Sequence, residues 1–207
     1  AAIYSALAKV AAGRPVIIRL FDIGGDKPVT YLGLPPEKNP FLGHRGVRLY
    51  ADFNALIKIQ LRAILRATAH GPLKIMVPMV SRVEEIQEVK ALLTEARAEL
   101  ATENISCAPA VELGAMLEIP SVAFAMPDLC RKVEFFSIGT NDLTQYFFAV
   151  DRNNTKVAPL YTPSHPAFLR LLKQLVEQAH AHGRWIGLCG EIGENTALLP
   201  LLIGLEL

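Results

Sequence analysis

The chain has 207 residues, of which 51% are hydrophobic and 20% charged, and its formal net charge is +1. This composition suits one domain with a substantial core, while scattered basic residues and a near-neutral balance argue against a DNA- or RNA-binding face. No uncharged apolar run approaches about 20 residues, and three cysteines without a CxxC pair indicate neither disulfides nor a zinc knuckle, so we expect a cytoplasmic protein without membrane insertion.

Short apolar runs alternate with amphipathic helical segments along the chain. In order, the pattern predicts a helix within residues 1–15, a strand over 15–22, a helix over 53–69, a strand over 73–79, a helix over 82–100, strands over 108–118 and 133–138, helices over 143–150 and 166–183, and a strand over 184–189. Apolar strands that alternate with such helices are typical of a parallel sheet or a (β/α) barrel. No linker divides the chain, so residues 1–207 are interpreted as a single domain.

Four of the predicted strands end in polar or reactive side chains. These are Arg19, Asp22, Glu118, Asn141, Asp142 and Cys189. A barrel brings the carboxyl ends of its strands to one pocket, whereas an open doubly wound sheet spreads them along an edge. The usual glycine-rich fingerprint of the open sheet is missing, because DIGGDK fits neither GxGxxG nor the P-loop. The pattern therefore favours the barrel.

Glu118 and Asp142 are candidate ligands of a divalent metal ion. Two carboxylates with room for water and substrate suit Mg²⁺ or Mn²⁺ better than zinc, which prefers histidine and cysteine. Glu118 directly precedes Ile119 and Pro120, so it is equally suited to begin a helix, where a carboxylate interacts well with the dipole. The residues alone leave both interpretations open.

Several cations stand in or beside turn-rich segments: Arg19, Arg45 and Arg152, with Lys27 as a further point charge. A planar guanidinium is the preferred clamp for phosphate, so metal and cations together indicate an anionic substrate that carries phosphate and carboxylate. Arg45 and Arg152 are equally compatible with ordinary loop positions.

Cys189 closes the last predicted strand between Leu188 and Gly190. A thiol of ordinary pKa, about 8.5, is mostly protonated at neutral pH and able to give a proton to carbon or oxygen. A lone cysteine after an apolar run is more often a buried small hydrophobe. We assign Cys107 and Cys130 to that class and keep both interpretations for Cys189.

Six segments, in this order, resemble the C-terminal domain of Enzyme I of the phosphoenolpyruvate (PEP):sugar phosphotransferase system. They are RLFDIGGDKP, NPFLGHRGVRL, LKIMVPMV, GAMLEIPS, FFSIGTNDLTQYFFAVDRN and GLCGEIG. Pyruvate phosphate dikinase and PEP synthase have related but less similar motifs. FDIGGDKP and PLKIMVPM are similar to the multiphosphoryl transfer proteins, in which Enzyme I is fused to other phosphotransferase modules.

The resemblance implies a (β/α)8 TIM-type barrel that binds PEP and Mg²⁺ at the carboxyl ends of its strands. By motif position, the metal ligands would be Glu118 and Asp142. Cys189 would be the acid that protonates C3 of the departing enolate. The residues that contact the substrate would be Arg19, Lys27, Arg45, Asn141, Asp142 and Arg152. Glu191 would lie near that thiol. The implied enzyme is a PEP-protein phosphotransferase that releases pyruvate, the first step of the sugar phosphotransferase system.

The chain also departs from the family pattern. It contains no GG-rich segment that ends in a Ser-His pair, so the phosphoryl acceptor is expected on the phosphohistidine domain of a longer protein, with a phosphocarrier protein as the next partner. The family's first barrel strand, with an Arg-Thr-Glu motif, is missing, and a further strand would be expected after Leu207. We therefore expect a barrel truncated at both ends. The family resemblance also implies a homodimer.

Two alternatives remain from other functional classes. A metal-dependent pyruvate or oxaloacetate lyase of the barrel aldolase type also pairs a glutamate with an aspartate, and carbon-bond cleavage without histidine phosphorylation would select it. The third hypothesis is a non-catalytic PEP-sensing or dimerisation module, which would bind PEP with metal but never protonate enolpyruvate.

Overall fold

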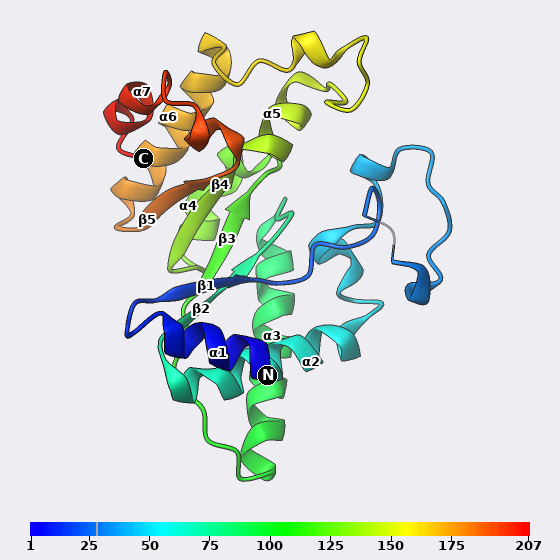
Figure 1. Ribbon diagram of the computed structural model, residues 1–207, viewed down its shortest axis with the longest axis vertical. Helices are drawn as coiled ribbons and strands as arrows, with labels where there is room; N and C mark the ends of the chain where they lie inside the picture. The colour runs from blue at the N-terminus through cyan, green and yellow to red at the C-terminus, as the bar shows by residue number, and fades with distance from the viewer. Residues whose placement is uncertain (28) are drawn as a thin grey trace. The chain divides into compact units, whose positions relative to one another are not determined.

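The computed structural model, which describes residues 1–27 and 29–207, is a mixed α/β chain with parallel strands (Figure 1). The described strands are β1 (Val16–Arg19), β2 (Leu73–Val77), β3 (Leu113–Leu117), β4 (Phe135–Gly139) and β5 (Trp185–Cys189). They follow one another in sequence order. The described helices are α1 (Ala2–Val10), α2 (Asn54–Ala67), α3 (Val83–Thr102), α4 (Val122–Cys130), α5 (Thr140–Phe148), α6 (Pro166–Ala181) and α7 (Leu199–Gly204).

The five predicted strands are confirmed, although their bounds differ from the expected ones: β1 ends at Arg19 and not at residue 22, and β2 ends at Val77 and not at residue 79. The third was expected from residue 108, but β3 begins at Leu113. Pro109 has no N–H to donate to a neighbouring strand, which disfavours pairing of the segment before β3. Helix α4 was not predicted, since Pro127 inside it is a strong helix-breaking signal.

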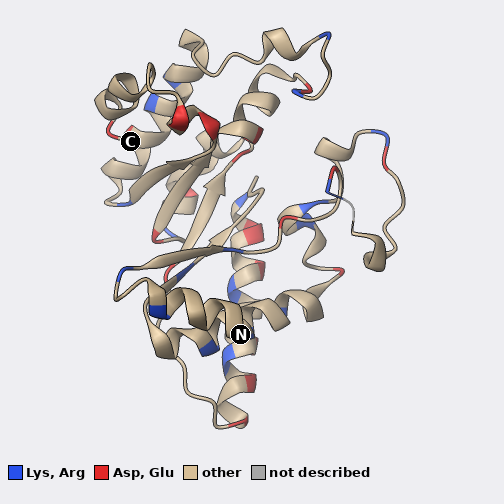
Figure 2. Cartoon of the chain, in the orientation of Figure 1, with Lys and Arg blue, Asp and Glu red and all other residues tan. Residues whose placement is uncertain are grey.

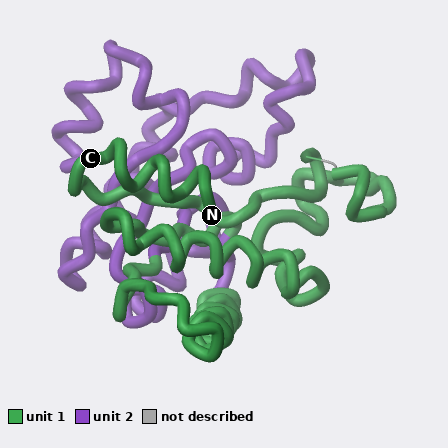
Figure 3. The backbone as a smooth tube through the Cα atoms, turned by 60° about the horizontal axis from the view of Figure 1, so that its bottom comes forward, with its two compact units in different colours: residues 1–79, 84–113 green, residues 80–83, 114–207 purple. Residues whose placement is uncertain are grey.

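The chain divides into two compact units, coloured in Figure 3. Unit 1 comprises Ala1–Met79 and Glu84–Leu113, and unit 2 comprises Val80–Val83 and Gly114–Leu207. The expected single domain over residues 1–207 stays a prediction. Across residues 1–27 and 29–207, no helix combines the length and apolar content that a membrane span requires.

Unit 1 contains the parallel pair β1 and β2, in which Val16 is opposite Leu73 and Arg19 is opposite Met76. Helix α2 buries one apolar face, as its periodicity predicts, with Ile57, Leu61, Ile64 and Leu65 at its centre. The polar side of α2 pairs with α3, where Lys58 and Arg62 both contact Glu99, at 2.9 and 3.0 Å. Figure 2 shows charges of both signs along α3.

Unit 2 contains the parallel strands β4 and β5 and all of β3 except Leu113. Successive residues of a strand point to opposite faces, so Phe136 and Ile138 lie on one face of β4, and Phe135, Ser137 and Gly139 on the other. On this second face Phe135 stacks on Trp185, with ring centroids 4.7 Å apart. A side chain at Gly114 would overlap the Phe135 ring. These two aromatic rings fill the amino-terminal part of this face. The carboxyl ends of the strands are left for polar groups.

Candidate functional site

The carboxyl ends of the unit 2 strands bring Glu118 and Cys189 to either side of Gly139. Gly139 is the register partner of Cys189 on β5. On its other side, a β-carbon at position 139 would lie 2.6 Å from Cγ and 2.9 Å from Oε1 of Glu118. The missing side chain at this position therefore makes room for the Glu118 carboxylate, while Cys189 lies opposite Gly139 on β5.

Glu118 and Asp142 are both buried, with 1% and 6% of their surface exposed. Asp142 lies in the first turn of α5, where the helix dipole favours a negative charge, and its Oδ1 accepts a hydrogen bond from Arg152 Nη1 at 2.8 Å. Buried carboxylates need cationic or hydrogen-bonded partners, and hard divalent cations prefer such oxygen ligands. The donor chemistry therefore fits Mg²⁺ or Mn²⁺.

Three or more metal-ligating side chains do not gather at one point anywhere in residues 1–27 and 29–207. Two carboxylate ligands alone, such as Glu118 and Asp142, would leave the other coordination positions of a cation to water and substrate. Mg²⁺ is usually bound in this way, through one or two carboxylates together with substrate phosphates.

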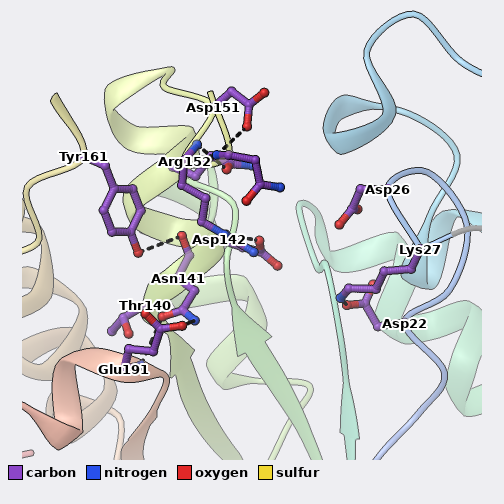
Figure 4. A network of polar contacts seen from close by, with 12 residues as sticks. Asp22, Asp26, Lys27, Thr140, Asn141, Asp142, Asp151, Arg152, Tyr161 and Glu191 are labelled. Atoms are coloured by element: carbon purple, nitrogen blue, oxygen red, sulfur yellow. Dashed lines mark hydrogen bonds and ion pairs between the residues drawn. The ribbon is translucent and has the colours of Figure 1, made fainter. Parts of the chain in front are cut away.

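Asn141 is held in place by the loop that follows β5. Its Nδ2 donates to Glu191 Oε1 at 3.2 Å, and its Oδ1 accepts from the backbone N–H of Glu191 at 3.1 Å (Figure 4). Gly190 allows this approach, because its φ is +117° and a side chain there would overlap the Thr140 hydroxyl. The loop thus fixes the orientation of the Asn141 amide, and Glu191, expected beside the thiol, contacts Asn141.

Arg152 is fixed at both its backbone and its side chain. Its backbone N–H donates to Gln145 Oε1 at 3.1 Å, while its guanidinium contacts Asp142. Tyr161 donates its hydroxyl to the backbone carbonyl of Asn141 at 3.3 Å. Burial raises the pKa of Tyr161, so it stays a neutral hydrogen-bond donor at physiological pH.

The Cys189 thiol is partly exposed and has two hydrogen-bond partners on β4. Its Sγ accepts from Ser137 Oγ at 3.2 Å and donates to the backbone carbonyl of Ile138 at 3.4 Å. Cys130 is 2% exposed, as its assignment to the buried class predicts, and burial raises its pKa. Cys107 is only partly buried, so its assignment to that class was too simple.

Unit 1 contains a cluster of cations around the buried carboxylate of Asp22. Arg45, which is fully buried, contacts both carboxylate oxygens of Asp22, with Nη2 to Oδ2 at 2.9 Å and Nε to Oδ1 at 3.3 Å. Lys27 donates to the same Oδ2 (Figure 4), and Arg19 Nη1 lies 3.6 Å from it. Asp26 makes a further ion pair with Arg45 at 2.9 Å.

The net effect of these neighbours is a lowered pKa for Asp22. Burial alone would raise it, but hydrogen bonds and charge from Arg45 and Lys27 outweigh the burial. Asp22 is therefore ionised at neutral pH and holds the cations of this loop together. Arg45 needs this partner, because an unpaired charge in the interior is strongly unfavourable.

The predicted site residues fall into both units. Arg19, Lys27 and Arg45 lie in unit 1, and Glu118, Asn141, Asp142, Arg152 and Cys189 lie in unit 2. The structure brings Glu118 and Cys189 to Gly139, and Asp142 to Arg152. The convergence of all eight on one pocket stays a prediction.

Sequence reasoning missed four residues that hold this machinery in place: Asp26, Ser137, Gln145 and Tyr161. Ser137 carried a signal, because a hydroxyl inside the apolar run FFSIG must find a hydrogen-bond partner when it is buried. The other three lie in loops or on a helix, where polar residues are ordinary.

A family model described as "PEP-utilising enzyme, PEP-binding domain" matches residues 1–207. The chain belongs to this family. The match covers every segment that carried the resemblance to Enzyme I, which is thereby confirmed.

Two curated relatives of the family are similar over nearly all of this chain. Multiphosphoryl transfer protein 2 of Escherichia coli (strain K12) is 55% identical over 95% of the chain, and the phosphoenolpyruvate-protein phosphotransferase of Staphylococcus carnosus (strain TM300) is 49% identical over 99% of it. The chain spans 24% and 36% of their lengths, respectively. It therefore corresponds to one part of these longer proteins.

Among solved structures, the chain is similar in fold to malate synthase of Haloferax volcanii in its lead(II) complex. The TM-score is 0.55 at 13% sequence identity, and the match covers 75% of this chain and 44% of that one. At this identity the likeness shows a common fold alone.

Proposed function

We propose that the chain binds PEP together with Mg²⁺ or Mn²⁺ and supports phosphoryl transfer from PEP to a histidine of a separate domain, with release of pyruvate. The observation that carries this proposal is the placement of Glu118 and Cys189 on either side of Gly139. Membership of the PEP-utilising family supports the substrate, and the names of the two curated relatives support the reaction.

Glu118 and Asp142 would hold the divalent cation, which when bound would offset negative charge on the phosphoryl group and the enolate oxygen. Arg152, fixed on Asp142, would bind the phosphoryl group beside Asn141. The amide of Asn141 is oriented for that contact by Glu191.

Arg19 and Lys27 are the more accessible cations of the Asp22 cluster, with 42% and 39% of their side chains exposed. We assign both to the phosphate or carboxylate of PEP. Arg45 is fully buried against Asp22 and Asp26, so its guanidinium is less accessible to substrate than the side chains of Arg19 and Lys27.

Cys189 would complete the reaction after the phosphorus–oxygen bond of PEP has broken. The enolate electron pair takes the thiol proton at C3, the S–H bond breaks, and the carbonyl of pyruvate forms. The thiolate then regains a proton from water. This role needs a protonated thiol within reach of substrate, and the partial exposure of Cys189 supports it.

We also propose that the five parallel strands form part of a (β/α)8 barrel, whose other strands lie outside the described residues, and that the protein works in the cytoplasm as a homodimer with a phosphocarrier partner. The chain spans at most 36% of the curated relatives named above, which is consistent with further segments.

Calorimetry of PEP binding tests the metal site. We expect Mn²⁺ to strengthen PEP binding by wild-type protein and to have little effect on Glu118→Gln. Glu88→Gln is the matched control, because Glu88 is exposed on α3. Equal PEP affinity with and without a chelator would refute the metal role. Cleavage of oxaloacetate without any histidine phosphorylation would select the lyase alternative instead.

A further inference from the structure

Ser137 contacts the Cys189 thiol from the interior of β4. It is 7% exposed, and its Oγ donates to Cys189 Sγ at 3.2 Å, while the thiol donates to the backbone carbonyl of Ile138. A buried hydroxyl without a hydrogen-bond partner is destabilising, so a polar residue in an otherwise apolar strand needs such a contact. The structure gives Ser137 the thiol as its partner.

The strand register explains why this contact is diagonal. Ser137 is opposite Gly187, and Cys189 is opposite Gly139, so neither residue faces a side chain across the pair. A β-carbon at Gly187 would find Trp185 Cζ3 at 3.6 Å as its nearest neighbour, which shows that the space beside Ser137 is open. The two glycines let the hydroxyl reach the sulfur two residues along the neighbouring strand.

We propose that Ser137 is a positioning residue for proton donation by Cys189, an inference that rests on the proposed function. When the S–H bond breaks and the proton moves to C3, negative charge develops on the sulfur. The Ser137 O–H bond stays intact and donates to that charge, and hydrogen bonds to charged groups are stronger than those to neutral ones. The same contact keeps the thiol at the strand end beside Gly139.

The pH dependence of Cys189 alkylation tests this role directly, in the full-length protein. Iodoacetamide reacts with the thiolate, so the alkylation rate reports the fraction of ionised Cys189. Trypsin cleaves after Arg184 and releases Cys189 in one peptide, while Cys107 and Cys130 share another that starts after Arg97. Mass spectrometry therefore follows Cys189 alone, with the second peptide as an internal control.

In Ser137→Ala we expect the midpoint of the alkylation profile to move up by about one pH unit, because the thiolate loses a hydrogen bond that is stronger than the same bond to the neutral thiol. The kcat for pyruvate formation should fall about tenfold while KM for PEP changes less than about twofold. Ser137→Thr, which keeps the hydroxyl, should restore both.

Ser137→Val is matched in shape to Ser137→Thr and lacks only the donor, so this pair provides the same comparison if the alanine variant does not fold. Identical alkylation midpoints for serine and alanine, or for threonine and valine, would overturn the role of Ser137. If the wild-type protein formed no pyruvate and the alkylation midpoint still moved up in Ser137→Ala, the Ser137 contact would be supported and the proposed function refuted.

Discussion

Replacement of Gly139 by alanine should displace the Glu118 carboxylate. The backbone of Gly139 has φ −84° and ψ 82°, so alanine brings no left-handed strain. Its β-carbon would instead lie 2.6 Å from Glu118 Cγ, 2.8 Å from Met116 Cε and 2.9 Å from Glu118 Oε1. Carbon atoms in contact are normally about 3.5–4.0 Å apart, so the Glu118 side chain must move by roughly 1 Å.

That displacement sets the expected magnitude. Overpacking of a tight interior typically costs about 1–3 kcal/mol, and a metal ligand must hold its distance within about 0.2 Å. Gly139→Ala should therefore weaken Mn²⁺ binding in the presence of PEP about tenfold or more, since about 1.4 kcal/mol corresponds to tenfold. The melting temperature should fall by a few degrees, at about 2–4 °C per kcal/mol for a chain of this size.

Gly187→Ala is the matched control for Mn²⁺ binding, because among the described residues the nearest neighbour of its β-carbon would be Trp185 Cζ3, at an ordinary 3.6 Å. Calorimetry with Mn²⁺ and PEP, and thermal unfolding followed by circular dichroism, measure both effects in the two variants. Equal Mn²⁺ affinity for Gly139→Ala and Gly187→Ala would refute the claim that residue 139 makes room for the carboxylate.

Two further predictions concern Asp22 and Gly190. The lowered pKa of Asp22 contributes stability above the ordinary aspartate pKa of about 3.9, and that contribution is lost as pH falls through the folded-state value. Asp22→Asn should thus lower the free energy of unfolding in urea by about 1–3 kcal/mol at pH 7, where Arg45 loses its two-oxygen partner and keeps the ion pair with Asp26, with a smaller loss at pH 3; equal losses at both pH values would contradict this. Gly190→Ala should weaken PEP binding through displacement of Asn141, as calorimetry can measure, since its φ of +117° and the Thr140 hydroxyl both disfavour a side chain; unchanged affinity would argue against the orienting role of this loop.

Local patterns were sufficient to predict the strands of this fold. Each strand is a short apolar run with a turn signal after it, and such runs are buried in most tertiary settings. The beginning of β3 and the existence of α4 were not predictable in the same way. In both, a proline gave a local signal, and only the surrounding structure decides whether pairing or helix continues past it.

The site was predicted in its residue types and only partly in its contacts. Polar groups at strand ends were recognisable, because they interrupt apolar runs. The contact between Ser137 and Cys189 depends on a strand register that joins residues 52 positions apart, and the pair of Asp22 and Arg45 spans 23 positions. Neither spacing carries a periodic signal, so these contacts became visible only in three dimensions.

Pyruvate formation from PEP by the full-length protein, compared between wild type and Cys189→Ala, tests the central claim most directly. The reaction is followed by reduction of pyruvate in a coupled assay, with PEP binding measured in parallel by calorimetry. We expect Cys189→Ala to bind PEP with little change and to form no pyruvate, because the enolate has lost its proton donor. Undiminished pyruvate formation by Cys189→Ala would contradict the account.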